Sequence, residues 1–207
     1  MGRSITVSGQ GRASSAYDEA TLQLAASARA TSPSDATARA TYAMSAMREA
    51  VLSGGVEASS LSTTNVSLNP VHDPWPTVVA YEASLGLAVR LTDLSRVGSL
   101  HVAAIDAGGD GARVDGIAFS HRDAAALARA ARDAAFLDAR TKAEQYAGLA
   151  GQALGEVRHV VEGDAVGGAH RHAVPLAAHT GGAVPVDAGE GTVAATVSVT
   201  WALGPAV

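Results

Sequence analysis

The histidines in the last third of the chain are the residues whose type and spacing are best suited to chemistry. Four of them lie in or beside one stretch rich in Gly, Ala, His and Pro: His159, His170, His172 and His179. In His170-Arg171-His172, a strand would place both imidazoles on one side, because side chains two apart share a face. Imidazoles with a carboxylate from Asp164 or Asp187 suit zinc, copper or nickel. The pattern predicts a metal site at His170 and His172; the alternative is a flexible loop with scattered histidines.

Trp75 is the second candidate, because it stands between Pro74 and Pro76 in a segment expected to be a loop. A tryptophan held at the surface by prolines would suit a contact with another protein, since Trp is enriched among the residues that dominate interface energies. The alternative is that Trp75 packs onto its own part of the molecule.

Acid–base chemistry has weaker candidates. The close pairs are Asp18-Glu19 and His72-Asp73, and neighbouring residues on a strand point to opposite faces, so Asp18 and Glu19 are not expected to cooperate. Gly9-Gln10-Gly11 lacks the third glycine of a phosphate-binding loop, and it predicts a turn or bulge between two strands. The sequence contains no Gly-x-Ser-x-Gly, Walker or His-Glu-x-x-His motif. We therefore expect no enzyme and no resident cofactor.

The composition of the chain argues against some classes of partner and some cellular locations. The 207 residues carry 15 Lys and Arg against 20 Asp and Glu, for a net charge of −5, which argues against a nucleic-acid partner. There is no cysteine, and no stretch is long and apolar enough for a spanning helix. The first residues, Met1-Gly2-Arg3-Ser4-Ile5, show no apolar leader. As written the chain is expected to be cytoplasmic; export to the periplasm is the alternative if a leader has been removed.

Hydrophobic periodicity predicts an α+β protein of mostly antiparallel sheet, with three helices packed on one face and the order ββαββαβαββ. Ser32-Pro33-Ser34-Asp35 is typical of a helix start, and the apolar positions that follow share one face: Ala36, Ala40, Ala43, Met47, Ala50 and Val51. The range 192–203 alternates most cleanly as a strand. We expect one domain, 1–207, or two α+β lobes formed by 1–75 with 150–207 and by 76–149.

Six segments, in order along the chain, carry a family resemblance. They are Ile5 to Gly11, Asp18-Glu19-Ala20-Thr21, Thr63 to Pro70, Tyr81 to Leu94, Gly116-Ile117-Ala118-Phe119, and Ala131 to Ala143. In this set the chain resembles the SIMPL-domain family over essentially its whole length. It departs where the family usually has Pro before the Asp of the second segment, because Tyr17 stands there.

The resemblance implies an α+β protein that self-assembles. It also implies links to the bacterial envelope, to oxidative-stress defence or to immunogenic surface antigens, and it supplies no catalytic residue set. Our leading hypothesis is a non-enzymatic scaffold or binding protein that forms a homo-oligomer through an exposed sheet face containing Val197 and Val199. The alternatives are a metal-binding protein using the His-rich loop 159–179 and an enzyme with an unrecognised site.

Overall fold

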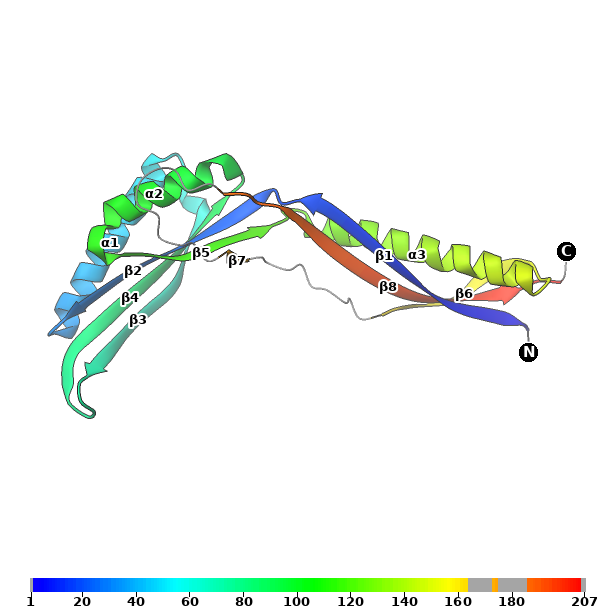
Figure 1. Ribbon diagram of the computed structural model, residues 1–207, viewed down its shortest axis with the longest axis horizontal. Helices are drawn as coiled ribbons and strands as arrows, with labels where there is room; N and C mark the ends of the chain where they lie inside the picture. The colour runs from blue at the N-terminus through cyan, green and yellow to red at the C-terminus, as the bar shows by residue number, and fades with distance from the viewer. Residues whose placement is uncertain (1, 164–172, 175–185, 206–207) are drawn as a thin grey trace. The chain divides into compact units, whose positions relative to one another are not determined.

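The structure is a computed structural model and describes residues 2–163, 173–174 and 186–205. Its helices and strands follow the expected order, with one additional two-residue strand, β7 (Figure 1). Their bounds are β1 Ser4–Ala16, β2 Glu19–Ala30, α1 Pro33–Ser53, β3 Leu61–His72, β4 Val78–Leu91, α2 Val97–Gly108, β5 Ala112–Ser120, α3 Ala124–Leu149, β6 Leu154–Glu162, β7 Ala173–Val174 and β8 Glu190–Leu203. The predicted α+β class with antiparallel sheets and three helices is confirmed.

The chain divides into two compact units. Among the described residues, unit 1 holds 2–16, 121–163 and 189–205, and unit 2 holds 17–120, 173–174 and 186–188. These bounds differ from the expected lobes, 1–75 with 150–207 and 76–149. The reason is long-range pairing: β1 pairs with β8, whereas β2 pairs with both β4 and β5 and so keeps 19–120 together.

Unit 1 is a three-stranded antiparallel sheet in the order β1-β8-β6, with α3 packed along one face (Figure 1). The buried face of α3 is a ladder of alanines four residues apart, namely Ala131, Ala135, Ala139, Ala143 and Ala147. Most of the ladder packs in one cluster with Ala195, Val197, Val199 and Trp201 of β8. Small side chains on α3 let the helix axis lie close to the sheet.

Glycines on β1 complete this close approach. A Cβ atom added at Gly9 would lie 2.1 Å from the carbonyl oxygen of Ala135, and one added at Gly11 would lie 2.1 Å from that of Ala131. Gly9-Gln10-Gly11 lies in the middle of a continuous strand, so the expectation of a turn or bulge is wrong. The glycines are there because the helix backbone rests directly on them.

The second face of the unit 1 sheet carries small polar side chains. Thr6 and Thr200 are joined by a hydrogen bond of 2.8 Å between their hydroxyls, and Ser14 and Thr192 by another of 2.8 Å. Val197 and Val199 are buried on the face that α3 covers. Expecting these two valines on an exposed sheet face is therefore wrong: alternation defines two faces of a strand but not which one a helix covers.

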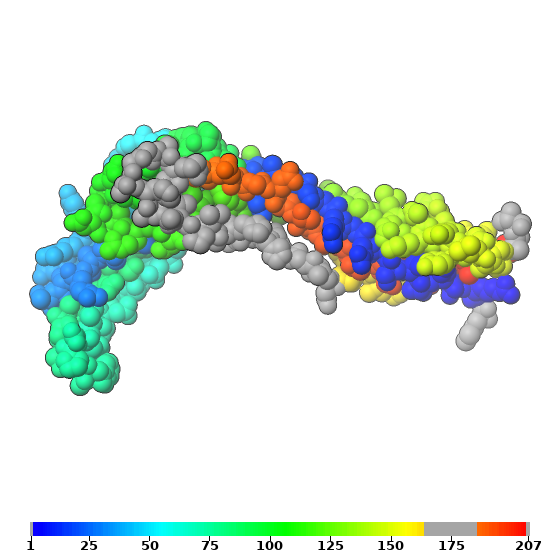
Figure 2. Space-filling model, in the orientation of Figure 1, coloured from blue at the N-terminus to red at the C-terminus, as the bar shows by residue number. Residues whose placement is uncertain are grey.

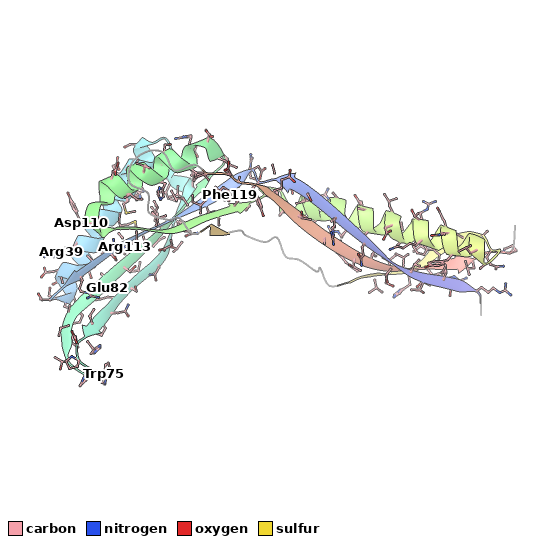
Figure 3. All side chains as sticks on the ribbon, in the orientation of Figure 1. Arg39, Trp75, Glu82, Asp110, Arg113 and Phe119 are labelled. Carbon is pink, nitrogen blue, oxygen red and sulfur yellow. The ribbon has the colours of Figure 1, made fainter. Side chains whose placement is uncertain are left out.

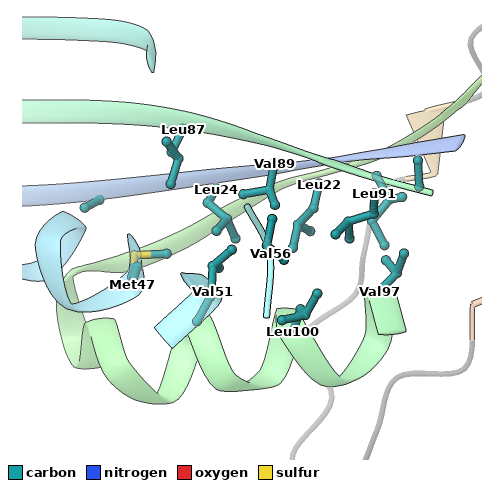
Figure 4. Close-up of a cluster of buried hydrophobic side chains, with 14 of the residues drawn as sticks. Leu22, Leu24, Met47, Val51, Val56, Leu87, Val89, Leu91, Val97 and Leu100 are labelled. Carbon is teal, nitrogen blue, oxygen red and sulfur yellow. The ribbon is translucent and has the colours of Figure 1, made fainter. Parts of the chain in front are cut away.

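Unit 2 is a five-stranded antiparallel sheet in the order β3-β4-β2-β5-β7, with α1 and α2 on one side (Figure 1). α1 begins as expected, because the Ser32 hydroxyl accepts a 3.1 Å hydrogen bond from the Asp35 amide and Pro33 occupies the first turn. The predicted face of α1 is buried except at Ala50, which is partly buried. The core is made of large aliphatic side chains, several of which are drawn in Figure 4: Leu22, Leu24, Met47, Val51, Val89, Val97 and Leu100. No helix in the described residues is apolar over a length that could cross a bilayer.

Candidate functional site

Most of the predicted metal ligands lie outside the described residues. This holds for His170, His172, His179 and Asp164. His159 is exposed on β6, and within the described residues no three His, Asp or Glu side chains gather to hold a metal ion. The metal site at His170 and His172 stays a prediction.

Trp75 lies at the tip of the β3–β4 hairpin and is 78% exposed (Figure 3). The hairpin turn is closed by the Asp73 amide, which donates a 3.0 Å hydrogen bond to the carbonyl of Thr77. The Trp75 ring is tilted against that of His72, with centroids 4.3 Å apart. A protein contact at Trp75 stays a prediction, and packing onto its own part of the molecule, here against His72, stays the alternative.

Other apolar side chains are exposed along the same hairpin. They are Val66 and Leu68 on β3 and Val78 and Val79 on β4. The hairpin extends from the rest of unit 2 (Figure 2), so α1 and α2 cover the base of these strands better than their tip. Clustered exposed apolar side chains on a projecting element are a common feature of interaction surfaces.

In the pair Asp18-Glu19, the Glu19 carboxylate is engaged in contacts at the start of β2. Glu19 accepts a 3.1 Å hydrogen bond from the Ser120 hydroxyl and lies 4.0 Å from Arg90, which are contacts that fix a strand end. His101 is the buried histidine of unit 2: its Nδ1 has no hydrogen-bond partner in the described residues, and burial lowers the pKa of its imidazole. This direction is the one expected for an imidazole removed from water, because burial disfavours its charged form.

Two charged side chains of α3, Asp138 and Lys142, contact the outer edge of β1. Asp138 Oδ2 accepts a 2.8 Å hydrogen bond from the Gln10 amide, and Lys142 Nζ donates a 3.2 Å hydrogen bond to the Ser8 carbonyl. Lys142 also contacts Asp138 at 2.6 Å. The hydrogen bond from Lys142, followed by that from the Gln10 amide, lowers the pKa of the Asp138 carboxyl. Together the two side chains occupy backbone groups that an edge strand would otherwise present to another chain.

The opposite edge of the same sheet is β6. In the described part of the chain no strand pairs with its outer side. Three valines on this strand, Val157, Val160 and Val161, are 43–49% exposed. Beside β6 lies a cavity of about 260 Å³ with Phe136, Val160 and Val197 in its wall and the ion pair of Arg132 with Glu162, at 3.7 Å, at its margin. An unpaired strand edge next to an apolar hollow is a candidate contact surface.

Two antiparallel sheets, each with helices on one face, define an α+β protein whose exposed strand edge and projecting hairpin are its candidate interaction surfaces. The chain belongs to the SIMPL family, described as a protein of unknown function (DUF541), which matches residues 5–201. It is 26% identical to proteins named 26 kDa periplasmic immunogenic protein from Brucella melitensis and from Brucella abortus, over 95% of this chain and 83% of each relative. Those names do not support the expectation of a cytoplasmic protein.

Proposed function

We propose that this protein is a non-enzymatic, self-assembling scaffold or binding protein, and that copies join through the free edge of β6. The observation that carries the proposal is the difference between the two edges of the unit 1 sheet. Asp138 and Lys142 occupy backbone groups on the β1 edge, and β6 has no such cover in the described residues. A second copy adding β6 to β6 would pair backbone groups that otherwise face water.

The sequence of β6 favours pairing with itself. In an antiparallel pair related by a two-fold axis at Val160, Arg158 of one copy lies opposite Glu162 of the other, and the reverse contact occurs on the other side of the axis. The exposed Val160 side chains then meet at the centre. Opposite charges across strands and apolar contact at the axis both stabilise such a pair, by about 0.2–1 kcal/mol for each cross-strand pair.

A non-enzymatic role is supported by what the described residues bring together. The cavity beside β6 is lined mainly by apolar side chains, with Arg132, Asp133 and Glu162 at its polar side. His101 is buried in a core, and Glu19 is engaged with Ser120 and Arg90. General acid–base catalysis requires a positioned pair at a cavity, and neither His101 nor Glu19 lines the cavity beside β6.

The test is the absolute mass of the full chain, measured by size-exclusion chromatography with light scattering over a range of concentrations. We expect a discrete oligomer for the native chain. Val160→Lys places like charges at the two-fold axis and should reduce the mass towards that of a monomer. Because Val160 is half exposed, its fold should persist, which circular dichroism and a thermal melt will check.

Leu149→Lys is the matched control, since Leu149 ends α3 in the same unit and is 78% exposed. It introduces the same charge away from β6 and should leave the oligomer intact. A native chain that is monomeric at every concentration, or a Val160→Lys variant that assembles like the native chain, would contradict the proposal.

We further propose that the protein acts in the bacterial envelope, where a connection to oxidative stress is one physiological setting. The support is the word periplasmic in the names of the two Brucella relatives. Fractionation of the source organism, with immunodetection of the chain in the periplasmic and cytoplasmic fractions, is the test. Recovery in the cytoplasm alone would contradict this part of the proposal.

A further inference from the structure

We propose that unit 2 contains a binding site for a small molecule bearing a carboxylate or phosphate group, built around Arg29, Arg39 and Arg113. The three arginines come from β2, α1 and β5 and line one cavity of about 380 Å³. Figure 3 shows Arg39 and Arg113 close together at the end of the unit, with Asp110 beside them. The site is independent of the assembly edge, which belongs to unit 1.

The cavity exists because β5 is shorter than the part of β2 that it could cover. β5 begins at Ala112, opposite Ala26, so residues 27–30 of β2 have no β5 partner. α1 closes one side of this space with Arg39, Tyr42 and Ala43. The turn before β5 closes the other side and approaches α1 closely, since a Cβ atom added at Gly111 would lie 2.9 Å from the Cβ of Ala43.

The charge of the lining is opposite to that of the whole chain. The residues that line the cavity include three arginines and one acidic residue, Asp110, in a protein whose net charge is −5. Arg39 is exposed and has no hydrogen bond or ion pair with any described residue. A local excess of positive charge with an uncommitted guanidinium attracts anions.

Arg113 and Arg29 can also supply N–H donors to an anionic ligand. Arg113 Nη1 donates hydrogen bonds to the carbonyls of Asp110 at 2.9 Å and of Ala112 at 2.7 Å, which orients the guanidinium while leaving further N–H groups for a ligand. Arg29 lies 3.1 Å from Glu82 in an exposed pair. Exposed pairs contribute little net free energy, so an anionic ligand can compete for Arg29.

The chemistry of the ligand follows from the guanidinium group. Its planar set of N–H donors matches the two oxygens of a carboxylate or of a phosphate, and such pairs are often bidentate. A volume of about 380 Å³ accommodates a small organic molecule as well as an inorganic ion. The exposed ring and hydroxyl of Tyr42 offer a stacking surface and a hydrogen-bond donor at the rim.

The test is titration calorimetry of the full chain with inorganic phosphate and, separately, with succinate, at low and at high sodium chloride. We expect binding of at least one of them that weakens as salt rises. Tighter binding of phosphate assigns the site to phosphorylated ligands, and tighter binding of succinate assigns it to carboxylates. Asp110→Asn should tighten either interaction because it removes the opposing charge.

Arg39→Gln is the decisive variant, because Gln is a good helix former and Arg39 makes no hydrogen bond or ion pair with any described residue. It should weaken binding by about tenfold or more, as expected for the loss of a charge-assisted hydrogen bond. Arg140→Gln on α3 removes the same charge from the other unit and should leave binding unchanged. Absence of binding by either probe, or equal binding by native and Arg39→Gln chains, would overturn the proposal.

Discussion

The two edges of the unit 1 sheet differ in how their backbone is covered. Along β1, a helix rests on two glycines, and its Asp138 and Lys142 side chains bond to the Gln10 amide and the Ser8 carbonyl. Along β6, three valines are half exposed, and no described strand pairs with the outer side of β6 in the sheet. Natural sheets commonly protect exposed edges against pairing with other chains. A sheet with one edge protected and the other left open can add a partner in one direction only.

The largest expected effect comes from Gly11→Val, which breaks the close contact between α3 and β1. Its Cβ would meet the backbone of Ala131 and Ala135 at 2.1–2.3 Å, and backbone cannot move aside as a side chain can. We expect a loss of more than about 3 kcal/mol in the free energy of unfolding, measured by urea denaturation.

Gly163→Ala is the control for that loss. Gly163 follows β6, and a Cβ there would meet Thr196 at an ordinary 3.5 Å. The free energy of unfolding should change by less than about 0.5 kcal/mol. Equal effects of the two substitutions would mean that the β1 side of the sheet is not more tightly packed against the helix than the β6 side.

A smaller loss in the free energy of unfolding is expected when the side chains that cover the β1 edge are removed. Asp138→Ala with Lys142→Ala removes both side chains from the strand, and the partly exposed pair contributes up to about 1 kcal/mol. Amide hydrogen exchange at Gln10 should accelerate, because its acceptor is lost. Unchanged exchange at Gln10 would show that the pair does not protect this edge.

The same pair predicts a dependence on pH. The pKa of Asp138 is lower in the folded chain than its ordinary value of 3.8. Its stabilising contribution is therefore fully present above that value and is lost as the pH falls through the lowered folded pKa. In the Asp138→Ala/Lys142→Ala variant, the free energy of unfolding should therefore fall less steeply with decreasing pH than in the native chain, when both are measured by urea denaturation across the acid range.

The start and the buried face of α1 could be predicted from the sequence, because they depend on interactions between residues close together in the chain. The cap at Ser32, the proline at Pro33 and the apolar face of α1 all follow from helix geometry. The start of α3 has the same local character, because the Asp123 side chain accepts a 2.8 Å hydrogen bond from the Ala126 amide. The family resemblance and the α+β class were also correct.

The rest depends on contacts between distant parts of the chain. Nothing local to Gly9 and Gly11 indicates that a helix 120 or more residues later in the sequence lies on them. For the same reason alternation in β8 could not assign Val199 to the covered face, and i,i+4 spacing could not reveal that Asp138 also reaches Gln10. The cavity lined by Arg29, Arg39 and Arg113 likewise requires the register that sets the start of β5.

Amide hydrogen exchange of the native chain, compared at low and high protein concentration, tests the difference between the two edges most directly. If copies join through β6, amides of residues 156–162 will exchange more slowly at high concentration, and the Gln10 amide, already bonded to Asp138, will not change. Exchange in β6 that is independent of concentration, or slowing confined to β1, would contradict the account.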